Sequence, residues 1–538
     1  MAAGIMRASA VMASGTMVSR VLGFAKAILL VAAIGQVASV SGDAFANGNL
    51  LPNTLYMILL GGMLNAVLVP QIVKAANDPD GGAGYINKVF TLVMTALTAV
   101  TAITLLAAPW IVWLFTVSWS EEQRALAIAF AYWCLPQIVF YGLYTMLGEV
   151  LNARSVFGPF TWAPVLNNVI AIIGIVVFMA MYGADGNGTR TPDDWTPGMI
   201  AVLAGSATLG VVAQAVILFV SWRKAGIRYR PDFRWRGMGL GQTARIAVWS
   251  LATIVVMQLG GIITQNVINT ASGHGPSALA MQNAWLLFMM PHSVIAVSLA
   301  TAYFTRLSTS AQNGRMDDFL SDFSTSARQI LLVMVLATVV IIATAPFISA
   351  VMNPGASPEL TGQFTVVLQC YVVGLAAYSF LFIVQRAFYA LSDTRTPFLF
   401  TTAQIVLLVV LTLGLLVLPK DMLGPAYALV FGFTTVVEAL IAVLLLRRRV
   451  GFIDASRILA SLLLDVIAAV PALLAGLLAM LLVVHLVPRF GMLAAIGLAI
   501  VVAAVSGAVY LVALKLLRSP ELAELTRFVS RKLGRNRS

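Results

Sequence analysis

Two basic residues stand inside a long apolar stretch near the start of the chain. Arg20 and Lys26 belong to the segment Ser-Arg-Val-Leu-Gly-Phe-Ala-Lys, within an apolar run at about residues 9–35. Because a charge inside a membrane is costly, such residues usually serve a function or form a buried ion pair. Six residues make about one and a half helical turns, so we expect both side chains on roughly one side of a helix. Together they suit an anionic ligand.

Other charged side chains lie inside later apolar runs. Glu149 near the end of the fourth run and Arg386 near the end of the tenth occupy equivalent places in an internal repeat. We therefore predict that this acid and this base meet as a gate in one conformation. Glu438 and Asp465 are isolated acids. Each either binds a coupling ion or has a structural role, in which it is protonated, capped or paired with arginine.

Amide side chains gather in the seventh apolar run. Gln265 and Asn266 follow Gly261 there, and the eighth run contains Pro291. Polar residues near helix breakers predict a bent pair of helices that lines a cavity, and the alternative is hydrogen bonding between closely packed helices. The second run repeats this pattern, so we expect a hinge at residues 61–65.

No signature of soluble catalysis is present in the sequence. There is no phosphate-binding Walker motif, the histidines are scattered, and Cys134 and Cys370 lie in apolar runs where packing is their usual role. ATP hydrolysis, a metal site, a cofactor and nucleic-acid binding are therefore not expected. Transport would be driven by the membrane potential, an ion gradient or a partner, and one charge crossing 100 mV yields about 2.3 kcal/mol.

The composition indicates that these residues are positioned by helices in lipid. Hydrophobic residues make up 60% of the 538 residues and charged residues only 10%, which excludes a soluble surface. The apolar runs are far longer than a barrel strand of about ten residues, so the class is an all-α polytopic membrane protein. About fourteen spans are expected, at about residues 9–35, 44–73, 87–117, 125–152, 159–183, 198–222, 243–272, 280–305, 322–352, 363–391, 398–419, 422–446, 457–487 and 490–517.

Lysine and arginine in the short loops predict the orientation. Loops after odd-numbered spans are rich in acid, with Asp193 and Asp194 as examples, and those after even-numbered spans are basic. The basic loops include Lys74, Lys88, Arg154, Arg223, Arg234, Arg306, Arg395 and Arg447. Because basic loops stay in the cytoplasm, both termini are expected there. The basic C-terminal tail fits a membrane surface.

The two halves of the chain repeat each other weakly. Leu-Asn-Ala-Arg-Ser-Val-Phe-Gly-Pro-Phe at residues 151–160 matches Phe-Tyr-Ala-Leu-Ser-Asp-Thr-Arg-Thr-Pro-Phe at residues 388–398, and Cys134 matches Cys370. A repeat of six spans predicts two lobes related by a pseudo-twofold axis, with two further helices at the end. The predicted parts are a first lobe at 1–222, a basic linker at 223–242, a second lobe at 243–449, helices thirteen and fourteen at 450–517, and a basic tail at 518–538.

These motifs resemble the MurJ/MviN family of lipid II flippases, in the MOP (multidrug, oligosaccharidyl-lipid and polysaccharide) exporter superfamily, and look like an actinobacterial branch. The resemblance rests on residues 19–26, on Asp-Ala-Phe at 43–45 with Leu-Pro-Asn at 51–53, and on residues 151–164 and 388–397. It implies two six-helix lobes around a cationic cavity in a bacterial cytoplasmic membrane. It also implies a groove beside helices thirteen and fourteen for a polyprenyl tail, and alternating access that carries the headgroup outward.

The resemblance also implies a set of side chains around the headgroup and diphosphate of lipid II. These are Arg20, Lys26, Asp43, Asn53, Asn152, Gln265, Asn266 and Arg386. Lys26 stands where arginine is more usual, and Trp285-Leu286 replaces a charged pair that many members have, so we expect a less cationic cavity. Structural pairing of the two cations with Asp43 is the alternative.

Three functions are consistent with the sequence. The first is lipid II flipping in peptidoglycan biosynthesis, with membrane lipids and cell-wall synthesis or division proteins as further partners. The second is MOP-type export of another lipid-linked glycan or of a small molecule, although a drug exporter would favour an acidic cavity. The third is a polytopic lipid glycosyltransferase, which would need acidic motifs in a sizeable outer loop, and the predicted loops are short.

Overall fold

The computed structural model describes residues 2–58, 80, 82–154, 156, 158–224, 229–234, 240–487 and 490–523. This part of the chain is helical and contains no β-strand. Thirteen of its helical segments are long and apolar enough to cross a membrane, which confirms an all-α multi-pass membrane protein. The expected second span begins with α2, but residues 59–79 lie outside the described part, and with them the expected hinge at 61–65 and Lys74.

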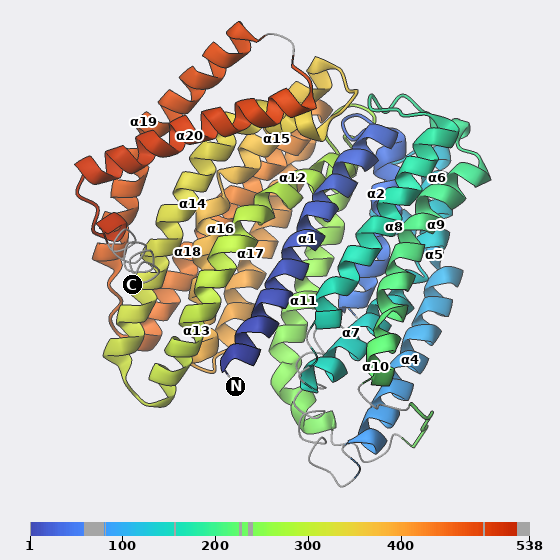
Figure 1. Ribbon diagram of the computed structural model, residues 1–538, viewed down its shortest axis with the longest axis horizontal. Coiled ribbons are helices and arrows are strands. Elements are labelled where there is room, and N and C mark those ends of the chain that lie inside the picture. The colour runs from blue at the N-terminus through green and yellow to red at the C-terminus, as the bar shows by residue number, and fades with distance from the viewer. Residues whose placement is uncertain are drawn as a thin grey trace. The chain divides into compact units, whose positions relative to one another are not determined.

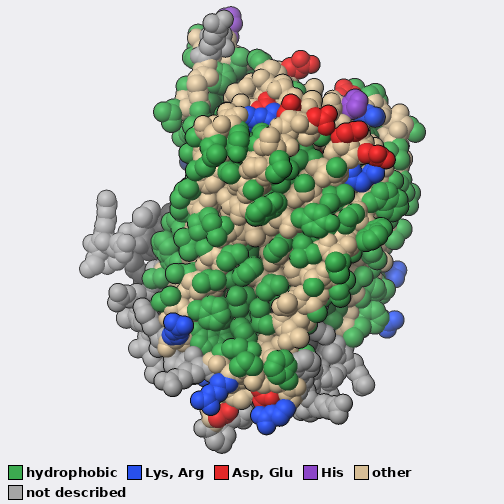
Figure 2. Space-filling view, turned by 90° about the vertical axis from the view of Figure 1, so that its right-hand side faces the viewer, with side chains coloured by type: hydrophobic (Ala, Val, Ile, Leu, Met, Phe, Trp, Pro, Cys, Tyr) green, Lys and Arg blue, Asp and Glu red, His purple; other side chains and the backbone are tan. Residues whose placement is uncertain are grey.

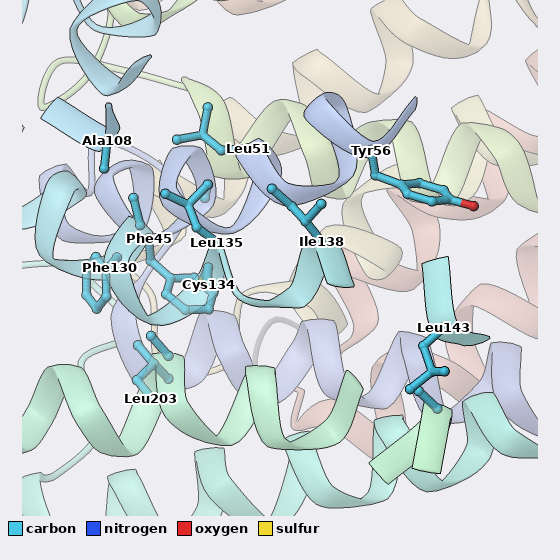
Figure 3. Packing of buried hydrophobic residues seen from close by; sticks show 14 of the residues in the cluster. Phe45, Leu51, Tyr56, Ala108, Phe130, Cys134, Leu135, Ile138, Leu143 and Leu203 are labelled. Atoms are coloured by element: carbon cyan, nitrogen blue, oxygen red, sulfur yellow. The ribbon is translucent and has the colours of Figure 1, made fainter. Parts of the chain in front are cut away.

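The first of two compact units comprises residues 1–273 with 277–279 and 353–356. Its elements, of which the α-helices are labelled in Figure 1, are α1 (Ala2–Ile34), α2 (Val40–Tyr56), α4 (Ala83–Leu106), α5 (Ala108–Phe115), α6 (Glu121–Cys134), α7 (Gln137–Ala153), α8 (Gly158–Tyr182), η3 (Pro192–Asp194), α9 (Pro197–Val216), α10 (Leu218–Lys224) and α11 (Leu240–Asn269). Figure 3 shows Phe45, Phe130, Cys134 and Leu135 close together in its core. The rings of Phe45 and Phe130 meet edge to face, with their centroids 5.4 Å apart.

The second unit holds the remaining helices, except that the first two residues of α12 group with the first unit. They are α12 (Ala278–Pro291), the π-turn η4 (His292–Ala296), α13 (Val297–Gln312), α14 (Met316–Met352), α15 (Pro358–Val372), α16 (Leu375–Ala390), α17 (Arg395–Gly414), η5 (Leu415–Val417), η6 (Lys420–Met422), α18 (Leu423–Val450), α19 (Ala455–Leu486) and α20 (Met492–Leu516). Helix α14 packs against α13, α15, α16, α19 and α20, so it is the central helix of this unit. The last two long helices, α19 and α20, pack against each other and against α14.

Irregular helices recur at matching places in the two halves of the chain. The fourth span breaks between α6 and α7 just after Cys134, and the tenth breaks between α15 and α16 shortly after Cys370. A π-helical turn also begins at Met57 after α2 and at His292 after α12. These matches agree with the internal repeat. Helix α11 groups with the first unit by contacts, whereas the repeat assigns residues 243–449 to one lobe, so the predicted domain bounds stay a prediction.

Charged side chains gather at the two ends of a broad hydrophobic surface on the face shown in Figure 2, with the acidic ones concentrated at one end. In the described part of the basic linker, residues 229–234 pack on the start of α4. The hydroxyl of Tyr229 lies 2.9 Å from Oγ1 of Thr91, and the backbone N–H of Asp232 donates to the same oxygen at 3.0 Å. Hydrogen bonds from Arg234 lower the pKa of Asp232 to about 2, so this carboxylate stays ionised.

Cysteine labelling tests the predicted orientation at this linker. The side chain of Arg234 is 85% exposed, so a cysteine placed there is open to reagents on its side of the membrane. We expect Arg234→Cys to resist a membrane-impermeant maleimide in intact cells and to react after the membrane is opened. Asp193→Cys, in an exposed loop after the fifth span, is the matched control and should react from outside. Labelling of Arg234→Cys from outside would contradict the orientation.

Candidate functional site

A small polar cavity lies inside the first unit, and Lys26 lines it. The cavity has a volume of about 100 Å³, enough for several water molecules, and is enclosed by α1, α2, α7, α8 and α9. Its polar lining consists of Lys26, Asn49, Gln137, Tyr141, Asn167 and Ser206. Apolar residues, among them Phe45 and Leu203, complete the wall. Lys26 is the one charged residue among the described residues that line this cavity.

Hydrogen bonds fix the amides around Lys26. Nε2 of Gln137 donates to Oγ1 of Thr208 at 2.8 Å, and its Oε1 accepts from the Tyr141 hydroxyl at 2.9 Å. Nδ2 of Asn167 donates to Oε1 of Gln214 at 2.8 Å. Because these amides are held by their neighbours, the cavity presents a preformed polar wall beside a half-buried ammonium group. Such an arrangement suits an anion or an anionic group.

Arg20 lies apart from this cavity. Six residues turn an α-helix through about 600°, so Arg20 and Lys26 differ by about 120° around α1. The structure accordingly exposes Arg20, whereas Lys26 faces the interior of the unit. The expectation that both lie on one side of the helix is therefore wrong. Among the described residues, no ion pair involves Arg20, Lys26 or Asp43.

Asp43 joins α2 to the segment that leads into α12. The side chain is fully buried; Oδ1 accepts from the backbone N–H of Leu279 at 3.0 Å and Oδ2 accepts from the Ser272 hydroxyl at 2.6 Å. Nearby, the Ser39 hydroxyl caps the start of α2 by accepting from the N–H of Gly42. In this structure Asp43 therefore serves as a structural anchor, and its predicted contact with a headgroup stays a prediction.

Replacing Asp43 tests the anchor. We expect Asp43→Ala to lower the free energy of unfolding by about 1–3 kcal/mol, because a buried N–H and a buried hydroxyl lose their acceptor. Asp43→Asn should cost less, since the amide oxygen can still accept from Leu279. Thermal unfolding of the purified protein gives the measurement, with the exposed Asp193→Ala as control. Equal stability of Asp43→Ala and the parent would contradict the anchor role.

The amides of α11 form hydrogen bonds between helices. Nδ2 of Asn266 donates to the carbonyl of Leu114 at 2.7 Å, so Asn266 satisfies a backbone group at the end of α5. Gln265 donates to Oδ1 of Asn269 at 3.0 Å, and Asn269 donates to Oδ1 of Asn47 on α2 at 3.1 Å. In this structure Asn266 thus ties α11 to α5 and Asn269 ties it to α2, while Gln265 bonds to Asn269 within α11. Hydrogen bonding between packed helices is the alternative that the sequence left open.

The other predicted site residues lie elsewhere. Asn53 is exposed on α2, and Asn152 interacts with Glu149 at the end of α7. Arg386 on α16 lies over the rings of two phenylalanines, 4.7 Å from the centroid of Phe382 and 5.5 Å from that of Phe304. Glu149 belongs to the first unit and Arg386 to the second, so their meeting as a gate stays a prediction.

Several polar contacts were not predicted from sequence. Of the cavity lining, only Lys26 was predicted, because the amides and hydroxyls lie in ordinary apolar runs on separate helices. In the second unit, the isolated acid Glu438 accepts from the Thr401 hydroxyl at 2.8 Å. Trp285 stacks on Phe288 with the centroids 5.0 Å apart, so an aromatic group stands where many relatives were expected to carry a charged pair.

Solved structures define the class of protein. A lipid II flippase MurJ in an inward closed conformation aligns with a TM-score of 0.69 at 18% identity, covering 93% of this chain and 98% of its own. An inward-facing multidrug resistance MATE family transporter of the MOP superfamily aligns with a TM-score of 0.65 at 16% identity, covering 82% of this chain and 98% of its own. The fold is that of a MOP-type membrane transporter.

Sequence comparison identifies the family. The family described as lipid II flippase MurJ matches residues 31–502. The probable lipid II flippase MurJ of Rhizobium meliloti (strain 1021) is 26% identical over 416 residues, 76% of this chain and 74% of the relative. The lipid II flippase MurJ of Burkholderia cenocepacia is 26% identical over 404 residues, 73% of this chain and 75% of the relative. This chain belongs to the lipid II flippase MurJ family, which confirms the predicted family and the prediction of a transporter rather than an enzyme.

Proposed function

We propose that this chain flips lipid II from the inner to the outer leaflet of a bacterial cytoplasmic membrane by alternating access. The observation that carries the proposal is the match to the lipid II flippase MurJ family over residues 31–502. Two cations on α1 without an acidic partner among the described residues support it, because a diphosphate supplies the anion that they lack. We further propose that both termini face the cytoplasm.

An apolar groove in the second unit supports a lipid-linked substrate. The groove has a volume of about 440 Å³ and is lined by α14, α16, α18 and α19 together with the segments beside them. All of its lining residues are apolar: Phe323, Leu331, Val373, Ala376, Ala377, Phe380, Val436, Ala439, Leu440, Val443, Ile453, Ala455, Ile458, Leu459 and Leu462. Contact with apolar side chains is favourable for an apolar polyprenyl chain. We therefore propose that the polyprenyl tail lies in this groove beside the thirteenth span.

The lining of the Lys26 cavity favours lipid II over a small cation as substrate. The MATE transporter that shares this fold is named for multidrug resistance. A cationic drug would favour an acidic cavity, but the described lining around Lys26 contains no acid. Export of another anionic, lipid-linked glycan fits the same chemistry and remains the second candidate.

Rescue of a bacterial strain depleted of its own lipid II flippase tests the proposal. We expect the chain to restore growth and cell shape. The same cells expressing the MATE transporter with this fold are the control and should lyse. Failure to rescue by a chain that reaches the membrane in normal amount would contradict lipid II as the substrate.

A further inference from the structure

A buried polar cluster lies where α14, α19 and α20 meet in the second unit. Asp465 on α19 and Tyr510 on α20 are fully buried, and Ser461, one turn before Asp465, is 4% exposed. Arg328 on α14 and Glu521, just after α20, are 2% and 1% exposed. The groove and the Lys26 cavity do not include any of these side chains. Lipid II flipping, as proposed above, does not use the cluster.

Three oxygens of this cluster have no hydrogen-bond partner among the described residues. They are both carboxylate oxygens of Asp465 and the hydroxyl of Ser461. The Tyr510 hydroxyl lies close to Asp465 and interacts with it, but it donates its proton to the carbonyl of Leu332 at 3.1 Å. Because residues four apart lie on the same face of a helix, Ser461 and Asp465 lie on one face of α19, one turn apart. Burying an ionised carboxylate without a hydrogen-bond donor costs free energy. We therefore expect a positively charged partner at these oxygens.

The charges of the cluster do not balance. Arg328 and Glu521 form an ion pair through Nη1 and Oε1, and Ser519 donates to the other oxygen of Glu521 at 3.1 Å. This pair is neutral in sum, so an ionised Asp465 leaves one net negative charge buried among described side chains. Among the described residues, the titratable groups that act on Asp465 from the packed elements are Tyr510 and Glu521, and Arg328 lies behind Glu521 as its ion-pair partner. One small monovalent cation restores neutrality.

We propose that Asp465 and Ser461 form a binding site for a small monovalent cation, either a sodium ion or a proton. Carboxylate and hydroxyl oxygens are hard ligands that suit sodium, and the same carboxylate can take up a proton. The site lies next to the apolar groove. Ile458 and Leu462 line that groove, and Asp465 follows Leu462 by three residues on the same face of α19. Cation binding therefore neutralises the buried carboxylate of α19 where this helix packs against α14 and α20 beside the groove.

Thermal unfolding of the full chain in lipid nanodiscs tests the site. A ligand that binds only the folded state raises the unfolding midpoint with its concentration. We compare sodium chloride with choline chloride at equal ionic strength and pH 8, and then lower the pH from 8 to 5 in choline chloride. A sodium site raises the midpoint with sodium, whereas a proton site raises it as the pH falls and leaves it unchanged by sodium. Asp465→Asn should abolish a sodium dependence, and it should reduce a pH dependence to the part that Asp43 and Glu438 contribute.

Two further variants keep the test decisive. For a sodium site, Ser461→Ala removes one oxygen ligand and should shift the sodium concentration at half effect upward roughly tenfold, which applies even if Asp465→Asn fails to fold. For a proton site, the same change should not weaken proton uptake, because a hydroxyl favours the ionised carboxylate. Glu438→Gln, a change at a second buried acid that has a partner in Thr401, should keep the dependence. The proposal is overturned if the parent shows no cation dependence, if Asp465→Asn keeps the dependence in full, or if only Glu438→Gln removes it. A sodium site is also overturned if Ser461→Ala leaves the sodium concentration at half effect unchanged.

Discussion

Arg20→Ala is expected to abolish flipping and to leave the amount and thermal stability of the protein in the membrane unchanged. Arg20 is exposed on α1 and forms no ion pair with a described residue. Removal of such a side chain usually changes the free energy of unfolding by less than about 0.5 kcal/mol. Its loss should instead remove the guanidinium that we propose holds two phosphate oxygens of the substrate through parallel hydrogen bonds. The measurements are membrane abundance, unfolding midpoint and flipping rate, taken separately.

Exchange between the two basic residue types sharpens this test. Arg20→Lys should reduce flipping more than Lys26→Arg, because a lysine ammonium acts as a point charge and cannot hold two oxygens in a fixed plane. Lys515→Ala removes an exposed cation at the end of α20 and serves as the matched control, with flipping expected near the parent rate. Normal flipping by Arg20→Ala at normal abundance would remove Arg20 from the site. Lost abundance would assign Arg20 a structural role instead.

Arg328→Ala is expected to cause the largest loss of stability. It would leave Glu521 and Asp465 buried without a base, and breaking a buried ion pair from one side costs about 3–5 kcal/mol. The double variant Arg328→Met with Glu521→Gln should recover much of this loss, because it removes both charges together. Thermal unfolding of the purified protein is the measurement.

A second ion pair beside α14 provides the control for Arg328. Arg315 and Asp318 form a pair in which both side chains are 58% exposed, and such pairs contribute about 0–1 kcal/mol. Arg315→Ala should therefore change the unfolding midpoint little. If Arg328→Ala lowered the midpoint no more than Arg315→Ala does, the buried pair would not stabilise the fold.

The helices of this fold are largely predictable because a membrane-spanning helix needs a long apolar run, which is easy to recognise in the sequence. Apolar runs longer than about twenty residues have to be helical, so the spans follow from hydropathy alone. The interruption after Cys134 is explained by Pro136, since proline removes a hydrogen-bond donor from the helix. The π-turn at His292 similarly follows Pro291. Hydropathy and proline therefore account for the helices and for the interruptions at Pro136 and Pro291.

The contacts that build the sites are not predictable in the same way. Arg328 and Glu521 are separated by 193 residues, and the partners of Asp43 by 229 and 236. Single apolar runs give no sign of which amides will meet, so the wall of the Lys26 cavity appears only once five helices pack together. The angle between Arg20 and Lys26 around the helix follows from the rotation of about 100° per residue. Counting turns alone did not show that the two side chains point to different sides.

The most direct test of the central claim is the amount of lipid II that reaches the outer leaflet. Cells depleted of their own flippase carry labelled lipid II and express this chain, and an enzyme that cleaves lipid II but cannot cross the membrane is added outside. We predict that the cleaved fraction rises with the parent chain, stays at the depleted level with Arg20→Ala, and rises again with Lys515→Ala. A cleaved fraction that stays at the depleted level with the parent chain, at normal membrane abundance, would contradict the account.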